Sequence, residues 1–240
     1  MISLHSIGTV NPTEQTIVMQ AKYGTPSPRG FLYCHGAGGS AQSAISDYGN
    51  QGQLCDRLTR DGLVGLATDL GGEQTWANDT AMSRTTDART YLNGTLGATG
   101  KTVLIGGSMG GAGALVWASR NPTLVACVVV IIPVVDITDI HANNRAGLAP
   151  LIDGAYSGGW SHVTYGATHN PVTLARAGAF DNIPILGFYG TTDTLCVPEA
   201  AEQFALESGA DMRPIPFGHE AAAYAAATPD EITAFIAQHT

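Results

Sequence analysis

The stretch "LIGGSMGGAGALVWASR", residues 104 to 120, runs from an apolar segment through a cluster of glycines into a second apolar segment with helical periodicity. Ser108 lies in a Gly-x-Ser-x-Gly pattern, with Gly106 two positions before it and Gly110 two positions after it. Between a strand and a helix, this pattern presents a serine hydroxyl above a sheet, and the glycines are needed because larger side chains would collide with neighbouring backbone. The stretch therefore predicts a strand, a sharp turn at Ser108, and a helix.

Apolar segments of strand length alternate with helix-like segments along the chain after a strand-rich start. The predicted strands are 15–23, 29–36, 62–70, 101–107, 125–135, 184–190 and 211–217. The predicted helices are 50–61, 80–96 (with Asp79 or Thr80 as N-cap), 109–120, 198–208 and 222–238. Repeated β–α units with near-continuously apolar strands form parallel sheets covered by helices on both faces. The pattern thus predicts one α/β domain over residues 1–240, with a doubly wound, mostly parallel sheet.

Residues 136–180 depart from this alternation, being rich in Gly, Asn, His and aromatic residues. A long irregular segment inside a compact domain is usually functional, so we expect a small cap or lid inserted there. Its aromatics Tyr156, Trp160 and Tyr165 are candidate contacts for an apolar or planar part of a substrate. Aromatic residues in such a segment could equally hold it against the core, and the sequence leaves both roles open.

Composition and charge exclude several classes of partner. The net charge is −9, with 11 basic residues among 240 and no basic stripe, so we expect no nucleic-acid partner. No apolar run reaches the roughly 18 residues of a membrane span. The N-terminal "MISLHSIGTVNP" has neither a basic nor a long apolar region, which favours a cytoplasmic protein. A phage particle or non-classical export stays open, and we expect a monomer or a homodimer.

The cysteines and histidines do not form the patterns of disulfide-rich or metal-binding proteins. Four widely spaced cysteines predict free thiols: Cys34, Cys55, Cys127 and Cys196. The segment 136–180 holds residues that could imitate a metal cluster: Asp136, Asp139, His141, His162 and His169. Because no short His-x₃₋₅-His pair is present among them, we expect no metal site. No organic cofactor is expected either.

A second glycine cluster, "GAGGSA" at residues 36–41, matches the dinucleotide fingerprint through Gly36, Gly38 and Ala41. Asp69 even follows at the end of the next strand, where a ribose-binding acid would lie. A lone match of this kind is a weak signal, and it gives His35 no role. The nucleophile interpretation of the other cluster explains more of the sequence.

A serine nucleophile needs a histidine base, and that base needs a carboxylate to orient it. Asp193 follows strand 184–190 and His219 follows strand 211–217, in the order Ser…Asp…His that this type of serine turn requires. Both residues would emerge at the carboxyl edge of a parallel sheet, where such sheets bind ligands. We therefore predict the triad Ser108, Asp193 and His219, with Asp136 as the reserve candidate for the acid.

The oxyanion of an acyl-transfer reaction needs two backbone N–H donors. Met109 follows the nucleophile and supplies one, and Ala37 in the loop after strand 29–36 is the predicted second donor. Gly38 is the alternative donor and is also expected to line the substrate site. We expect His35 to brace this loop.

The segments "HGAGG", "GGSMGG", "GTTDTLCVP" and "FGH" together resemble the oxyanion loop, nucleophile turn, acid loop and histidine loop of the α/β-hydrolase family, in that order. The resemblance covers about residues 16–238, and residues 169–198 further resemble the dienelactone-hydrolase and prolyl-oligopeptidase-like branches. It implies a cofactor-independent carboxylesterase that forms an acyl-enzyme on Ser108 and acts on a small-molecule or lipid-like ester. A peptidase, a thioesterase and a non-catalytic binding module, such as part of a phage particle acting on a host envelope, remain the alternatives.

Overall fold

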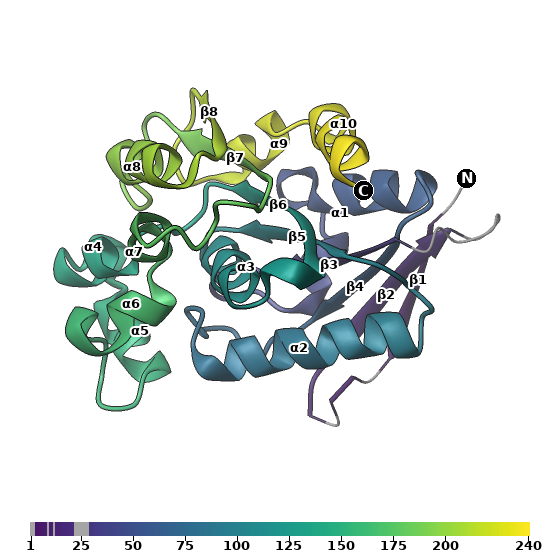
Figure 1. Cartoon of the computed structure of the whole chain (residues 1–240), viewed down its shortest axis with the longest axis horizontal. Helices are drawn as coiled ribbons and strands as arrows, with labels where there is room; N and C mark the ends of the chain where they lie inside the picture. Colours follow the sequence, from purple (N-terminus) through teal and green to yellow (C-terminus); the bar gives the residue numbers. More distant parts are fainter. Residues whose placement is uncertain (1–2, 9, 12, 22–28) are drawn as a thin grey trace.

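The computed structural model describes residues 3–8, 10–11, 13–21 and 29–240. Within these residues a single sheet of eight strands has the order β1-β2-β4-β3-β5-β6-β7-β8 (Figure 1). Its strands are β1 (Ser3–Gly8), β2 (Thr16–Ala21), β3 (Gly30–Cys34), β4 (Val64–Thr68), β5 (Thr102–Gly107), β6 (Val125–Ile131), β7 (Ile185–Gly190) and β8 (Asp211–Ile215). Strands β3 to β8 pair in parallel, while β2 is antiparallel to both of its neighbours. The predicted doubly wound, mostly parallel sheet is confirmed.

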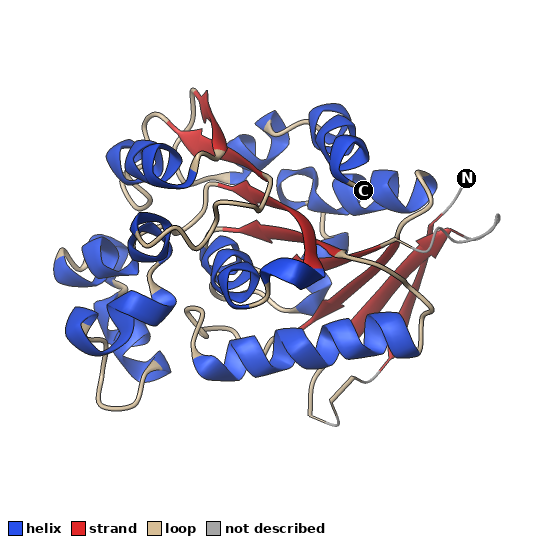
Figure 2. Ribbon diagram, viewed as in Figure 1, coloured by secondary structure: helices blue, strands red, loops and turns tan. Residues whose placement is uncertain are grey.

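Helices cover both faces of this sheet, as Figure 2 shows. They are α1 (Gln51–Arg60), α2 (Asp79–Gly94), α3 (Met109–Arg120), α8 (Pro198–Ser208), α9 (Ala221–Ala226) and α10 (Pro229–His239). Side chains of α2, α3 and α8 pack into one apolar core, and those of α1, α9 and α10 pack into a second core across the sheet. The central strands are buried on both sides, which is why they read as continuous apolar runs. In the described residues, no helix is long and apolar enough to cross a bilayer.

Three details differ from the sequence-based expectations. Strand β1 was not predicted; it pairs with β2 at the edge of the sheet. The N-cap of α2 is Asn78, whose side chain accepts from the Ala81 N–H, rather than Asp79 or Thr80. The helix predicted over 222–238 is two helices, α9 and α10. Pro229 is the first residue of α10, because proline has no N–H to donate inside a helix and its ring would clash with the preceding turn there. Thr228 caps this helix.

Residues 136–180, where we expected an insertion, fold into short helices at one end of the sheet (Figure 1). These are α4 (Ile137–Ala142), α5 (Ala149–Ala155), the π-helical turn η5 (His162–Gly166), α6 (Ala167–His169) and α7 (Pro171–Arg176). Helix α7 packs against α3 and α8, which ties the segment to the main domain. Most of the segment is therefore helical, although its composition is typical of loops.

The parallel register brings four loops to one edge of the sheet. Cys34 at the end of β3 pairs with Gly106 of β5, and Gly107 pairs with the last residue of β6. On the other side, Gly190 at the end of β7 pairs with the last residue of β8. Because parallel strands end at the same edge, the loops after β3, β5, β7 and β8 emerge side by side there. These are the loops that carry the predicted catalytic residues.

Candidate active site

Ser108 forms the turn between β5 and α3 and has a backbone φ of +51°. A non-glycine residue in this region is strained and persists only where its surroundings hold it. The end of β6 does so on both sides: the Ser108 N–H donates to the Ile131 carbonyl at 3.1 Å, and the Ser108 carbonyl accepts from the Val134 N–H at 3.0 Å. The turn thus projects the serine side chain beyond the end of the sheet, at the start of α3.

The glycines on either side of Ser108 are required by close backbone contacts. A Cβ atom on Gly106 would collide with the Gly110 carbonyl, and one on Gly110 would collide with the Cys34 carbonyl. On the next residue, Gly111, it would come within 2.7 Å of the Pro133 side chain. The pattern predicted from the sequence therefore has a steric cause at each of these positions.

His219 and Asp193 extend from Ser108 in one line of hydrogen bonds. The Ser108 Oγ lies 2.8 Å from His219 Nε2, and His219 Nδ1 lies 2.8 Å from Asp193 Oδ2. The other oxygen of the buried Asp193 carboxylate accepts the backbone N–H groups of Leu195 at 2.8 Å and Cys196 at 2.9 Å. An ionised carboxylate only accepts, so His219 carries its proton on Nδ1 and turns the Nε2 lone pair to the serine hydroxyl.

Two backbone N–H groups next to Ser108 are unused. In the described part of the chain, neither the Ala37 N–H nor the Met109 N–H has a hydrogen-bond acceptor. Met109 is the first residue of α3, where N–H groups have no intrahelical partner. The alternative donor, the Gly38 N–H, is already bonded to the Glu73 carbonyl at 2.9 Å. This arrangement favours Ala37 over Gly38 as the second donor.

His35 and Asp69 hold the loop that carries Ala37. His35 is buried, and its two ring nitrogens lie 2.9 Å from the carbonyl oxygens of Gly36 and Asp69. The Asp69 carboxylate accepts from the backbone N–H groups of Gln15 at 2.8 Å and Ala41 at 2.9 Å. Asp69, which the dinucleotide interpretation would use as a ribose-binding acid, is thus hydrogen-bonded to the protein's own backbone. Both side chains brace the loop, as expected for His35.

An open cleft of about 340 Å³ lies at Ser108. It is lined by Gly36, Ala37, Gly38, Gly39, Ser43, Tyr48, Gln51, Ser108, His219 and Tyr224. No lysine, arginine, aspartate or glutamate is among these described lining residues. Sequence reasoning missed Ser43, Tyr48, Gln51 and Tyr224. The only sequence signal for any of them is that Tyr224 follows His219 by five positions.

The aromatic residues expected as substrate contacts lie elsewhere. None of Tyr156, Trp160 and Tyr165 is among the described residues that line the cleft. The Tyr156 ring lies 4.7 Å, between centroids, from both Trp160 and Tyr165. Its buried hydroxyl donates to the Trp76 carbonyl at 2.6 Å, in the loop between β4 and α2. This geometry corresponds to the second of the two expected roles, which is to hold the segment 136–180 against the core.

The reserve acid Asp136 is used locally. Its carboxylate caps α4 by accepting from the Asp139 N–H at 3.1 Å, and it also accepts from the Asn170 side chain at 3.0 Å. The hydrogen bond to the His219 ring is made by Asp193.

The histidines considered as metal ligands have separate partners. His141 bonds to Asp153, His162 to Thr138, and His169 to Arg120 and Asp79. In the described residues, one set of side chains has metal-compatible spacing: Asp193, Cys196 and His219, whose ligand atoms lie within 4.8 Å of one another. Of these three side chains, Asp193 and His219 already share a hydrogen bond.

The third, Cys196, is a poor ligand because burial, followed by the nearby Asp193 and Asp139 charges, raises the pKa of its thiol well above the usual value. The described arrangement at this site therefore fits a catalytic triad better than a metal centre. All four cysteines are free thiols, as predicted.

Comparisons with known proteins place these features in a family. The model of the family described as "Putative esterase" matches residues 45–214, a range that includes Ser108 and Asp193. A comparison with curated protein sequences finds no match.

Solved structures share the fold at low sequence identity. An S-formylglutathione hydrolase from Agrobacterium tumefaciens superposes with a TM-score of 0.72 at 16% identity, covering 99% of this chain and 95% of that one. The fluorophosphonate-binding serine hydrolase FphF from Staphylococcus aureus gives 0.70 at 17% identity, covering 98% and 97%. The esterase Pf2001 from Pyrococcus furiosus gives 0.67 at 14% identity, covering 99% and 91%.

Proposed function

The chain belongs to this esterase family and is a serine ester hydrolase, and on that premise we propose that it cleaves small, uncharged carboxylic esters through an acyl-enzyme on Ser108. The observation that carries the proposal is the line of two 2.8 Å hydrogen bonds from Ser108 through His219 to Asp193. It ends on a serine held in a strained turn, near the N–H groups of Met109 and Ala37, which have no acceptor among the described residues.

In the first half-reaction, the Ser108 Oγ attacks the ester carbonyl carbon while His219 Nε2 takes the hydroxyl proton. The negative charge that develops on the carbonyl oxygen is stabilised by the N–H groups of Met109 and Ala37, at the positive end of the α3 dipole. His219 then gives the proton to the leaving alcohol. Asp193 holds the imidazole in the required tautomer and stabilises its positive charge throughout.

In the second half-reaction, water enters the position that the alcohol has left. His219 Nε2 takes a proton from this water, which attacks the acyl carbon of the Ser108 ester. Collapse of the second tetrahedral intermediate breaks the bond to Oγ, and the proton returns to the serine. The products are the carboxylic acid and the free enzyme.

The lining of the cleft supports an uncharged substrate. With no lysine or arginine among the described lining residues, an anionic acyl or alcohol group would lose solvation without gaining an ion pair. The cleft of about 340 Å³ is also in the range of small-molecule sites. The lining therefore favours neutral over anionic esters, and the volume favours small ones.

Hydrolysis of p-nitrophenyl esters tests this function. We expect turnover of p-nitrophenyl butyrate, its loss in Ser108→Ala, and much weaker turnover of mono-p-nitrophenyl succinate, whose acyl group has a similar length but carries a carboxylate. No turnover of any p-nitrophenyl ester by the wild-type protein would refute the proposed function. Equal turnover of butyrate and succinate esters would refute the preference for neutral substrates.

A further inference from the structure

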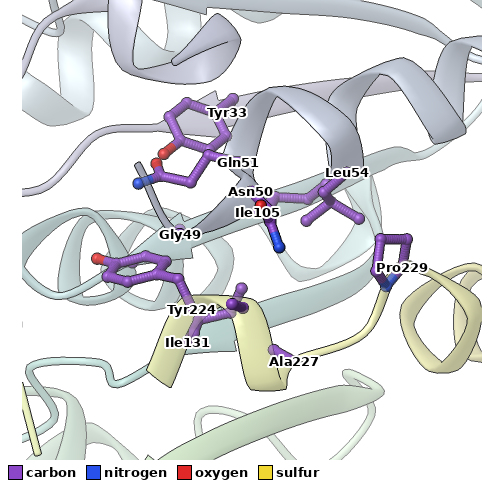
Figure 3. A pocket seen from close by; sticks show the side chains of 13 residues that line it. Tyr33, Gly49, Asn50, Gln51, Leu54, Ile105, Ile131, Tyr224, Ala227 and Pro229 are labelled. Carbon is purple, nitrogen blue, oxygen red and sulfur yellow. The ribbon is translucent and has the colours of Figure 1, made fainter. Parts of the chain in front are cut away.

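A second, enclosed hollow lies behind the nucleophile turn, and the mechanism above does not use it (Figure 3). This enclosed cavity has a volume of about 10 Å³ and is lined mainly by apolar or aromatic side chains, including Tyr33, Leu54, Ile105, Ile131 and Pro229. The backbone of Gly106 and Gly107, directly before Ser108, forms part of its wall. Its volume is enough for about one water molecule.

Two side chains, Gln51 and Tyr224, line both the enclosed cavity and the cleft at Ser108. In Figure 3, Tyr33 and Gln51 lie on one side of the cavity, and Tyr224 and Ile131 lie on the other. Tyr224 belongs to α9, the helix that follows the His219 loop, and its ring is buried. The aromatic ring of Tyr224 is therefore part of the partition between the two hollows.

The surrounding backbone is shaped to accept this ring. A Cβ atom on Gly107 would collide with the Tyr224 hydroxyl and ring, and one on Gly49, which has a φ of +57°, would collide with the Tyr224 Cβ. Tyr48 packs edge-on against the ring with centroids 5.7 Å apart. Glycines at two distant positions and a second aromatic ring thus fix Tyr224 where it separates the cleft from the cavity.

The chemistry of the proposed reaction assigns the two sides of the site to different parts of the substrate. The alcohol must leave, and water must enter, on the side of His219 Nε2, and the His219 side chain is 23% exposed. The acyl group stays bonded to Ser108 between these events. On this assignment, the acyl group lies along the part of the cleft that Tyr224 lines.

We propose that Tyr224 sets the acyl-chain length of the substrate by closing the enclosed apolar cavity behind Ser108. This inference rests on the proposed ester hydrolysis. With the ring in place, an acyl chain on Ser108 meets the partition after a few carbons and has no apolar space beyond it. Without the ring, the cleft, the space that the ring filled and the small cavity join, and a longer chain can bury its methylenes in this joined space, whose wall includes Leu54, Ile105 and Ile131. Each buried methylene then favours the longer substrate by about fourfold.

The test is a series of p-nitrophenyl esters from acetate to decanoate, which varies the acyl chain and keeps the leaving group constant. The wild-type protein should have its highest kcat/KM at acetate or butyrate. In Tyr224→Ala, the octanoate-to-acetate ratio of kcat/KM should rise at least about fifteenfold, which corresponds to two newly buried methylenes. Tyr224→Phe keeps the ring and should keep the wild-type ratio. Tyr224→Leu, which retains an aliphatic side chain if the alanine variant does not fold, should give an intermediate ratio.

The proposal is overturned if a folded Tyr224→Ala or Tyr224→Leu variant hydrolyses acetate with an unchanged chain-length ratio, or if the wild-type protein already prefers octanoate. This outcome is distinct from failure of the proposed function, in which the wild-type protein hydrolyses none of the esters. Labelling of Ser108 by a fluorophosphonate in each variant confirms that the nucleophile itself is intact.

Discussion

Replacing Asp193 by asparagine should abolish most of the catalysis while leaving the fold in place. Asp193 Oδ1 accepts the N–H groups of Leu195 and Cys196, so an asparagine keeps both hydrogen bonds only by turning its amide oxygen toward them. Its NH₂ group then points at His219 Nδ1, where Asp193 Oδ2 lies at 2.8 Å in the wild-type protein. The backbone of the acid loop thus decides which way the amide faces.

That orientation puts His219 in the wrong tautomer. His219 Nδ1 would accept from the amide, its proton would move to Nε2, and an N–H would then face the Ser108 Oγ in place of a lone pair. The same substitution in a serine-protease triad lowers kcat by about 10⁴-fold. This factor corresponds to about 5.5 kcal/mol of activation free energy, and we expect a loss of that order here.

The assay is the steady-state hydrolysis of p-nitrophenyl acetate, with circular dichroism to verify the fold. The matched control is Asp136→Asn, which changes the reserve acid at the start of α4 in the same way and should keep kcat within about threefold. A folded Asp193→Asn protein that retains more than about a tenth of wild-type kcat would refute the assignment, against the expected 10⁴-fold loss. An equal loss in Asp136→Asn would refute it as well.

Gly110→Ala should lower the free energy of unfolding by about 1–3 kcal/mol, because the added methyl group meets the Cys34 carbonyl. Gly113→Ala, one turn along α3, adds a methyl group with no neighbour within 4 Å and should not lower the free energy of unfolding. Equal losses of unfolding free energy in the two variants, measured by urea unfolding, would contradict the steric account. Burial, and then the Arg120 guanidinium, lower the pKa of His169 below its usual 6.5. The stability that neutral His169 contributes is therefore complete above pH 6.5, and it is lost as the pH falls through the pKa of the folded protein. His169→Gln should therefore flatten the decline in the free energy of unfolding from about pH 7 to pH 5, and an unchanged slope would contradict this assignment.

The elements next to the nucleophile could be predicted closely from the sequence. Helix α3 begins and ends at the residues expected, because the Gly-x-Ser-x-Gly pattern marks its start and its glycines have direct steric causes. The proximity of Asp193 and His219 could be predicted because each follows a strand, and strands in a parallel sheet end at one shared edge. In these cases the local sequence contains the physical reason for the structure.

The remaining features depend on contacts that no local pattern encodes. Tyr156 was a candidate substrate contact, but its position is determined by a hydrogen bond to Trp76, eighty residues away. The cleft wall formed by Tyr48, Gln51 and Tyr224 comes from two segments, at the start of α1 and in α9, that meet only after the helices pack on the sheet. Strand β1 is stabilised at the sheet edge by pairing with β2, and its own sequence shows no clear alternation.

The central claim is that Ser108 alone is the activated nucleophile, and covalent labelling tests it most directly. Incubation of the wild-type protein with a fluorophosphonate, followed by intact-mass and peptide-mapping mass spectrometry, should show one adduct per chain, located on Ser108. Loss of ester hydrolysis should follow the extent of labelling, and Ser108→Ala should take up no label. An adduct at another residue, or a wild-type protein that hydrolyses esters while Ser108 remains unlabelled, would contradict the account.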